Sequence, residues 1–179
     1  MRPHDLAPAE GPAWASAVLL HPHPEMGGDR FNNVVTALYD ALPPAGATAV
    51  RFDFGTADIE AAATEAVETL ELLPDRPRFL IGYSFGGGVA ATIADDGVDG
   101  WFLVAPALTS VESAIGDDPR PKAVVAAEHD QFFPPAQLEA ATKDWRATQS
   151  MTIAGADHFF VGRADAVAQR CVEWLRARV

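Results

Sequence analysis

Six short apolar runs recur along the chain, and each ends in a segment rich in turn-forming residues. Runs of this length, made largely of Ala, Val, Ile, Leu and Phe, predict strands that are buried on both faces of a sheet. The predicted strands are 14–20, 47–54, 78–81, 98–104, 123–127 and 150–153.

Helical periodicity fills the intervals between these runs. From Asp29 onward, apolar residues recur every three or four positions, at Phe31, Val34, Val35, Leu38, Tyr39 and Leu42. Further helices are predicted at 58–73, 87–94, 135–145 and 163–178. Strands that alternate with helices predict an α/β fold, with a parallel sheet and helices on both of its faces. Right-handed crossovers favour the spatial strand order 2-1-3-4-5-6.

Length and charge narrow the class of protein. The 179 residues suit one domain, 1–179. Thirteen basic and 25 acidic residues give a net charge of −12, which disfavours nucleic acid and anionic membrane surfaces as partners. Cys171 is the single cysteine and shares a helical stripe with Val167 and Leu175, so we expect it in the core. We find no signal-peptide pattern and no apolar run of membrane-spanning length, and we therefore expect a cytoplasmic location.

The stretch Gly82-Tyr83-Ser84-Phe85-Gly86 connects the third predicted strand to a helical segment of small residues. A G-x-S-x-G motif between a strand and a helix is typical of a nucleophile elbow. The turn strains the serine backbone, and both glycines lie where a side chain would meet neighbouring backbone. Ser84 is then a candidate nucleophile beside the N–H groups at the start of the helix, where an oxyanion can be stabilised.

A serine nucleophile needs a base and an acid that orients the base. In α/β folds with a nucleophile elbow, the acid and then the histidine follow the serine along the chain. Asp130 follows the fifth predicted strand and His158 follows the sixth, so both lie at the same edge of the sheet as Ser84. The sequence therefore predicts a Ser84–His158–Asp130 triad. The other candidate acids are Glu128, Asp157 and Asp53.

The loop after the first predicted strand reads His21-Pro22-His23-Pro24-Glu25-Met26-Gly27-Gly28. An oxyanion hole in this fold uses the N–H after the nucleophile, here Phe85, and one N–H from this loop. Proline has no N–H, so His23 is the best donor between the two prolines. We expect His21 to brace the loop instead.

A metal site is the competing interpretation of the histidines, because His-x-His spacing can bind zinc. The prolines stiffen this segment, and neither an H-E-x-x-H motif nor a cysteine cluster supports it. We therefore expect no metal. The candidate ligands would be His21, His23, His129, Asp130 and His158.

Together these motifs resemble the α/β-hydrolase superfamily, and within it a bacterial group of small lidless hydrolases with an H-P-H-P-x-x-G-G loop. The resemblance rests on residues 21–28 with Asn33 downstream, and on 82–86, 129–130 and 155–160. It implies the Ser84–His158–Asp130 triad, no cofactor, and hydrolysis of an ester, a thioester or an amide.

The chain departs from that group in two places. Relatives carry an R-F-x-F-R-G-x-G segment after the second strand, whereas residues 51–56 here lead directly to a helix, so the relatives' substrates are not a guide. Only residues 1–13 precede the first predicted strand. We expect them to be irregular and the first two antiparallel strands of a full-length hydrolase to be missing. The short interval between Ser84 and Asp130 leaves no room for a cap domain.

The expected function is hydrolysis of small acyl esters or thioesters through an acyl-enzyme, by a carboxylesterase-like or thioesterase-like enzyme. We expect several phenylalanines, including two pairs adjacent in the sequence, to line a substrate pocket. Packing of the paired phenylalanines in the core is an equally good explanation. Acyl transfer or perhydrolysis with the same triad and a non-catalytic binding module remain alternatives, and the oligomeric state stays open. The expected pocket residues are Met26, Phe85, Phe132, Phe133, Phe159 and Phe160.

Overall fold

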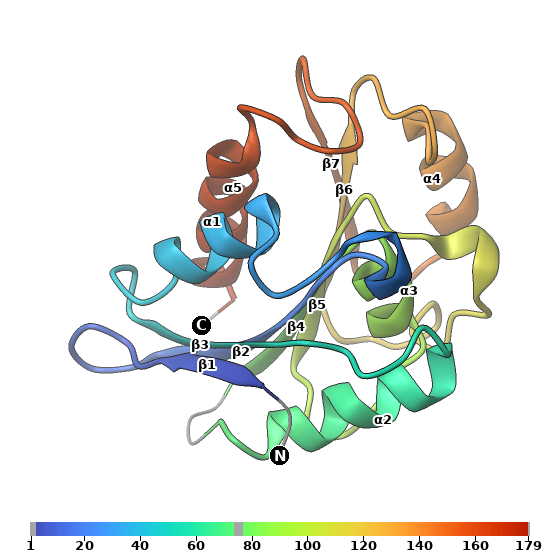
Figure 1. The fold of residues 1–179 in the computed structure, drawn as a ribbon. Helices are drawn as coiled ribbons and strands as arrows, with labels where there is room; N and C mark the ends of the chain where they lie inside the picture. The colour runs from blue at the N-terminus through green and yellow to red at the C-terminus, as the bar shows by residue number, and fades with distance from the viewer. Residues whose placement is uncertain (1–2, 74–76, 179) are drawn as a thin grey trace.

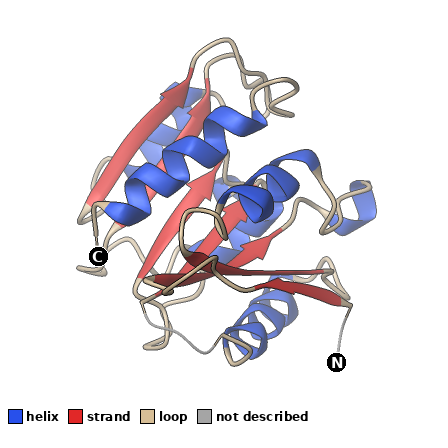
Figure 2. Cartoon of the chain, turned by 90° about the vertical axis from the view of Figure 1, so that its left-hand side faces the viewer, coloured by secondary structure: helices blue, strands red, loops and turns tan. Residues whose placement is uncertain are grey.

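A computed structural model describes residues 3–73 and 77–178 and shows a twisted sheet between two layers of helices (Figure 1). Within these residues the sheet has seven strands in the spatial order β1-β3-β2-β4-β5-β6-β7. Figure 2 shows the strands edge to edge, with helices in front of and behind them. The strands are β1 (His4–Ala7), β2 (Ala15–Leu20), β3 (Ala47–Phe52), β4 (Arg78–Tyr83), β5 (Gly100–Val104), β6 (Lys122–Ala127) and β7 (Thr148–Ile153).

The helices divide between the two faces of the sheet. One face is covered by α1 and α5, and the other by α2, α3 and α4, each face with its own apolar cluster. The helices are α1 (Asn33–Ala41), α2 (Ile59–Leu70), α3 (Phe85–Ala91), α4 (Pro135–Thr142) and α5 (Ala164–Arg176), with short 3-10 turns η1 (Pro24–Met26) and η2 (Leu108–Ser110). The α/β class and the helices on both faces are confirmed.

The pairing of the six parallel strands β2 to β7 confirms the predicted order 2-1-3-4-5-6. The expectation of an irregular segment over 1–13 was wrong, because β1 pairs antiparallel with β3 at the sheet edge. The four residues of β1, two polar followed by two apolar, do not alternate, so the hydrophobic pattern does not predict this strand. Its Asp5 carboxylate pairs with the guanidinium groups of Arg51 and Arg30, which fixes its place.

Helix α1 begins later than predicted. The Asn32 side chain accepts a hydrogen bond from the Val34 N–H at 3.0 Å, which caps the helix after the predicted start at Asp29. Phe31 therefore lies before the helix rather than on its apolar face, and 55% of it is exposed. Its ring lies under the Arg30 guanidinium, 4.3 Å from the centroid. The other predicted elements are present, with ends that differ by a few residues.

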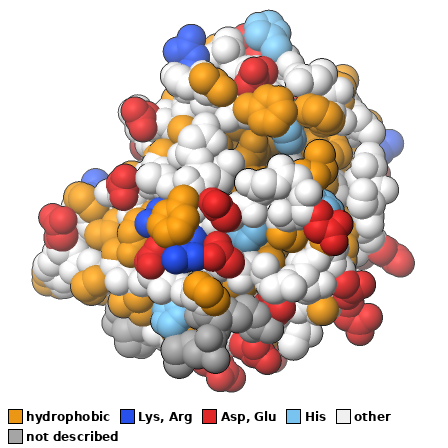
Figure 3. All heavy atoms as spheres, in the orientation of Figure 1, with side chains coloured by type: hydrophobic (Ala, Val, Ile, Leu, Met, Phe, Trp, Pro, Cys, Tyr) orange, Lys and Arg blue, Asp and Glu red, His pale blue; other side chains and the backbone are white. Residues whose placement is uncertain are grey.

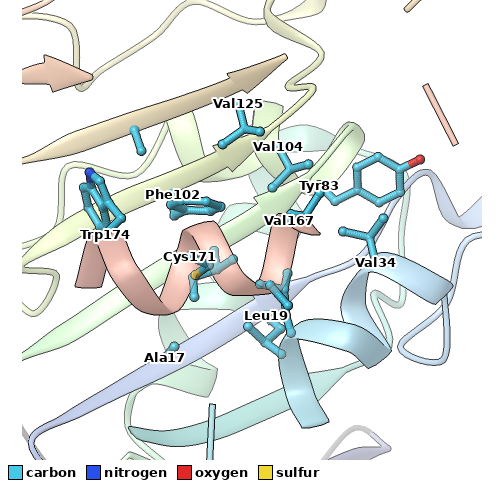
Figure 4. Close-up of a cluster of buried hydrophobic side chains, with 14 of the residues drawn as sticks. Ala17, Leu19, Val34, Tyr83, Phe102, Val104, Val125, Val167, Cys171 and Trp174 are labelled. Atoms are coloured by element: carbon cyan, nitrogen blue, oxygen red, sulfur yellow. The ribbon is translucent and has the colours of Figure 1, made fainter. Parts of the chain in front are cut away.

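The core under α1 and α5 contains the single cysteine. Figure 4 shows Cys171 and Val167 on α5 pointing toward Phe102 and Leu19 on the strands. Cys171 is fully buried, which confirms its predicted core position. Burial also raises the pKa of its thiol well above the usual range.

The burial of Cys171 predicts that its thiol does not react in the folded protein, because the reactive form is the exposed thiolate. We expect no reaction with Ellman's reagent in native buffer and one equivalent of thiol in denaturant. Absorbance of the released thiolate measures both. Rapid reaction of the native protein would contradict this packing.

Candidate active site

Four segments meet at the carboxyl edge of the sheet, where the strand order reverses between β2 and β4. The His21–Gly28 loop leaves β2, and Ser84 follows β4. Asp130 and His158 follow β6 and β7 on the same edge. The sheet topology thus brings together residues that are far apart in the sequence.

Ser84 lies in a tight turn with an unusual backbone conformation, and close contacts between backbone segments surround it. Its φ of 52° and ψ of −112° lie outside the regions that L-residues usually adopt. A Cβ at Gly82 would lie 2.2 Å from the Gly86 carbonyl oxygen. A Cβ at Gly86 would lie 2.3 Å from the Leu20 carbonyl oxygen. Both glycines are therefore required by close approach, as the sequence predicts, and the turn lies directly against the end of β2.

A series of hydrogen bonds leads from the serine hydroxyl to a buried carboxylate. Ser84 Oγ lies 3.2 Å from His158 Nε2, and His158 Nδ1 lies 2.8 Å from Asp130 Oδ2. The Tyr83 hydroxyl donates to the His158 carbonyl oxygen at 2.8 Å and holds the loop that carries the ring. This contact escaped the sequence analysis, because no local pattern links Tyr83 to His158.

The Asp130 carboxylate is buried, and both of its oxygens accept hydrogen bonds. Its second oxygen, Oδ1, accepts the backbone N–H groups of Phe132 and Phe133 at 2.8 and 2.9 Å. Burial alone raises the pKa of this carboxyl, but the hydrogen bonds from His158, Phe133 and Phe132 outweigh it and hold the pKa below the usual range. Asp130 is thus an anion at neutral pH, able to keep His158 Nδ1 protonated.

The other candidate acids make different contacts. Glu128 is exposed and accepts the Gly155 N–H at 2.7 Å. Asp157 accepts the Phe159 N–H at 3.0 Å within its own turn. Asp53 binds Arg30 on the far side of β2. Asp130 is the acid that contacts His158.

The loop after β2 is folded tightly on itself. The His23 carbonyl accepts the N–H groups of Met26 and Gly28 at 3.1 and 3.0 Å. A Cβ at Gly28 would lie 2.2 Å from the Pro22 carbonyl oxygen. The His23 ring packs edge-on against the Phe85 ring, with 5.0 Å between centroids. The two predicted oxyanion-hole residues are thus neighbours.

His21 braces this loop, as the sequence predicts. Its Nδ1 lies 2.6 Å from the Pro22 carbonyl oxygen, and its Nε2 accepts the Phe54 N–H at 2.9 Å. Both contacts are made by the neutral ring with its proton on Nδ1. Burial lowers the pKa of His21, outweighing the Pro22 contact and nearby carboxylates, the first of which is Asp53.

A cavity of about 550 Å³ opens beside Ser84. Figure 3 shows hydrophobic side chains gathered around a histidine on this face. The predicted pocket residues Met26, Phe85, Phe132, Phe133 and Phe159 line it. The lining also includes Asn32, Ala57, Ile59, Ala107 and Ser110, which sequence analysis missed because they come from three separate loops and helix starts.

Phe160 is a correction, because it packs in the core instead of lining the cavity. It is fully buried, with its ring centroid 5.9 Å from that of Tyr83. Phe160 has a φ of 52°, and the neighbouring Phe159 is exposed. The alternative of core packing thus holds for Phe160, and the pocket prediction for Phe159.

The histidines proposed as metal ligands do not gather. Across residues 3–73 and 77–178, no group of three or more His, Cys, Asp or Glu side chains is arranged to hold a metal ion. His21 uses one ring nitrogen to contact Pro22 and the other to contact Phe54, and His129 is exposed beside Glu128.

Among the described residues, no helix is long and apolar enough to cross a membrane.

Comparison with solved structures identifies close likenesses over nearly the whole chain. An α-β serine hydrolase homologue from Coxiella burnetii superposes with a TM-score of 0.85 at 27% identity, covering 96% of this chain and 90% of the other. A serine hydrolase without a lid from Xanthomonas campestris has a TM-score of 0.82 at 21% identity, covering 97% and 88%.

A third likeness is Est1E from Butyrivibrio proteoclasticus, solved with ferulic acid bound. Its TM-score is 0.82 at 15% identity, covering 98% of this chain and 94% of the other. At such identities the Xanthomonas and Butyrivibrio structures bear on the fold alone. No family model matches the sequence, and no curated protein matches it.

The lowered pKa of His21 predicts a loss of stability in mild acid. The unfolded chain binds the His21 proton near pH 6.5 and the folded chain only at lower pH, so acid favours unfolding. The stability that the neutral His21 ring contributes is complete above the pKa of His21 in the unfolded chain. It is lost as the pH falls through the lower pKa of His21 in the folded chain. Asp130 adds a loss of the same sign below its unfolded value of 3.8.

Urea unfolding at about pH 7 and about pH 5 measures this dependence. We expect the parent to lose stability over this range and His21→Asn to lose less of it. His129→Asn, which changes an exposed histidine, serves as the control and should keep the parental slope. An equal slope in the parent and His21→Asn would contradict the assignment.

Proposed function

We propose that this chain, whose fold is similar to those of solved α/β serine hydrolases, is itself a serine hydrolase of small acyl esters or thioesters. The observation that carries the proposal is the hydrogen-bonded series Ser84–His158–Asp130 beside an apolar cavity. In this proposal Ser84 is the nucleophile, His158 the general base and then acid, and Asp130 the group that orients His158.

In the acylation step, Ser84 Oγ attacks the acyl carbonyl carbon while its proton passes to His158 Nε2. The Asp130 carboxylate holds the other proton on Nδ1 and stabilises the imidazolium. When the tetrahedral intermediate collapses, His158 returns its proton to the leaving alkoxide or thiolate, and the acyl group stays on Ser84. Water then repeats the sequence, releasing the carboxylic acid and the free Ser84 hydroxyl.

Two backbone N–H groups would stabilise the oxyanion of the intermediate. The first is that of Phe85 at the start of α3, where N–H groups have no partner within the helix. The second is that of His23, in the loop that the Gly86 N–H ties to the elbow through the His21 carbonyl at 3.1 Å. The contact between the His23 and Phe85 rings supports their joint role.

The cavity favours small, uncharged acyl groups. Its lining is largely apolar, with phenylalanines 132, 133 and 159 all within 5.6 Å of the His158 ring, measured between centroids. Burying a charged substrate group against such a lining costs free energy unless it is paired. The net charge of −12 also slows the approach of anions.

Covalent labelling tests the proposed nucleophile. We expect a fluorophosphonate to add one phosphonyl group to the parent and none to Ser84→Ala or His158→Ala, because labelling needs both the hydroxyl and its base. Intact mass measures the adduct. We expect kcat for an activated ester to fall by about 10⁶-fold in His158→Ala and about 10⁴-fold in Asp130→Asn.

Two matched variants control this experiment. Ser150→Ala and His129→Ala change an exposed serine and an exposed histidine outside the site, and both should label like the parent. A folded parent that stays unlabelled would remove the proposed mechanism and favour a non-catalytic binding module at the same cleft.

The charge of the substrate supplies a separate prediction. Between two esters of equal acyl length, the neutral one should have a higher kcat/KM than one with a terminal carboxylate, by about 10-fold or more. Added salt should narrow the difference, because it screens the repulsion between the acidic protein and the anion. Initial rates in low and high salt measure both effects. A preference for the anionic ester would contradict the description of the cavity.

A further inference from the structure

The segment 53–55, which we call the anchor segment, follows β3 and contacts both ends of the loop 21–30. At one end of the loop, the Phe54 N–H donates to His21 Nε2 at 2.9 Å. At the other end, the Arg30 N–H donates to Asp53 Oδ1, also at 2.9 Å. Consecutive residues therefore fix the two ends of the loop that carries the His23 N–H.

The Asp53 contact is more than one hydrogen bond. The Arg30 guanidinium pairs with Asp53 Oδ2 and with Asp5 Oδ2, and Asp5 also pairs with Arg51 at 3.0 Å. The Arg30 and Asp53 side chains are 18% and 30% exposed, so water screens this pair less than a fully exposed one. The guanidinium also covers the Phe31 ring. Arg30 is held from several sides, and Asp53 is its link to the anchor segment.

The anchor segment is itself fixed from the opposite side. The Gly55 N–H donates to Glu65 Oε2 at 2.9 Å, and Glu65 is a buried residue of α2. The loop 21–30 is thus tied through residues 53–55 to a helix packed in the core. A loop held at both ends against a rigid support keeps a backbone N–H in one position.

Aromatic contacts extend from the same segment to both proposed oxyanion donors. The Phe54 ring packs against the His21 ring, with centroids 4.8 Å apart, and against the Phe85 ring at 5.4 Å. The Phe85 ring in turn contacts the His23 ring. A shift of Phe54 would therefore be felt at both residues whose N–H groups face the oxyanion in the proposed mechanism.

We propose that the anchor segment positions the oxyanion hole, with Asp53 as a positioning residue that acts through Arg30 and the loop 21–30. The inference rests on the proposed hydrolase function. It assigns a task to the short connection after β3, the place where the sequence departs from the related group. Asp53 does not line the cavity, so its effect on the reaction is indirect.

The variant Asp53→Asn tests this role, because it keeps an oxygen for the Arg30 N–H but removes the charge paired with the guanidinium. We expect kcat for a neutral activated ester to fall by about 10-fold to 100-fold, since small displacements of catalytic groups have effects of this size. KM should change much less. Binding of a trifluoromethyl ketone, whose serine adduct carries an oxyanion, should weaken in parallel with kcat.

Asp118→Asn is the matched control. Asp118 pairs with Arg120 at 2.6 Å before β6, at the opposite edge of the sheet from the site. The variant Asp118→Asn also loses a partly buried Asp–Arg ion pair. Its free energy of unfolding therefore measures how much stability is lost with such a pair when the site is not affected. We expect Asp118→Asn to keep the parental kcat. Two variants of Arg30, the partner of Asp53, test the same ion pair from its other side. Arg30→Lys keeps the positive charge and should retain activity, whereas Arg30→Gln removes the charge and should lose activity.

Amide hydrogen exchange separates this proposal from the hydrolase proposal. We expect the amides of His23 and of residues 25–28 to exchange faster in Asp53→Asn than in the parent. In Asp118→Asn their exchange should equal that of the parent. An active parent with unchanged kcat and ketone affinity in Asp53→Asn would overturn the positioning role. Unchanged exchange of these amides in Asp53→Asn would overturn the positioning role, whether or not the parent is active. Failure of the parent to react with a fluorophosphonate would instead remove the hydrolase proposal.

Discussion

The backbone turn at Ser84 determines where every other group of the site must lie. A non-glycine residue at φ 52° costs about 1–3 kcal/mol, which the surrounding structure must offset. The turn is closed because Gly82 approaches Gly86, and Gly86 approaches the end of β2, at distances that exclude a Cβ. The turn and the loop after β2 therefore form one unit, and neither can move without the other.

The surrounding elements hold that unit from opposite sides. On one side, the loop carrying His158 is fixed by the Tyr83 hydroxyl and by the buried carboxylate of Asp130. On the other, the loop carrying His23 is fixed by its contacts with residues 53–55. Both supports follow parallel strands of one sheet, β3 and β6, or lie at the end of one, β4, so the sheet holds in place groups that lie in loops.

The sequence predicted the parts of this arrangement that depend on local pattern and on the common edge of parallel strands. It placed Ser84, Asp130 and His158 together because each follows a strand. It missed β1, because the two polar and two apolar residues of that strand do not alternate. It could not distinguish Phe159 from Phe160, because tertiary packing decides which of these two adjacent rings contacts Tyr83. The lining by Ala107 and Ser110 depends on a turn-rich segment without periodicity.

In the mechanism that we propose, Ser84 reacts within an oxyanion hole formed by the His23 and Phe85 N–H groups. A crystal structure of the protein with a phosphonyl group bound to Ser84 would locate this hole, because the phosphonyl oxygen occupies the place of the oxyanion. We expect this oxygen to lie within hydrogen-bonding distance of both backbone nitrogens. An adduct on another residue, or an oxygen turned away from either nitrogen, would contradict this mechanism.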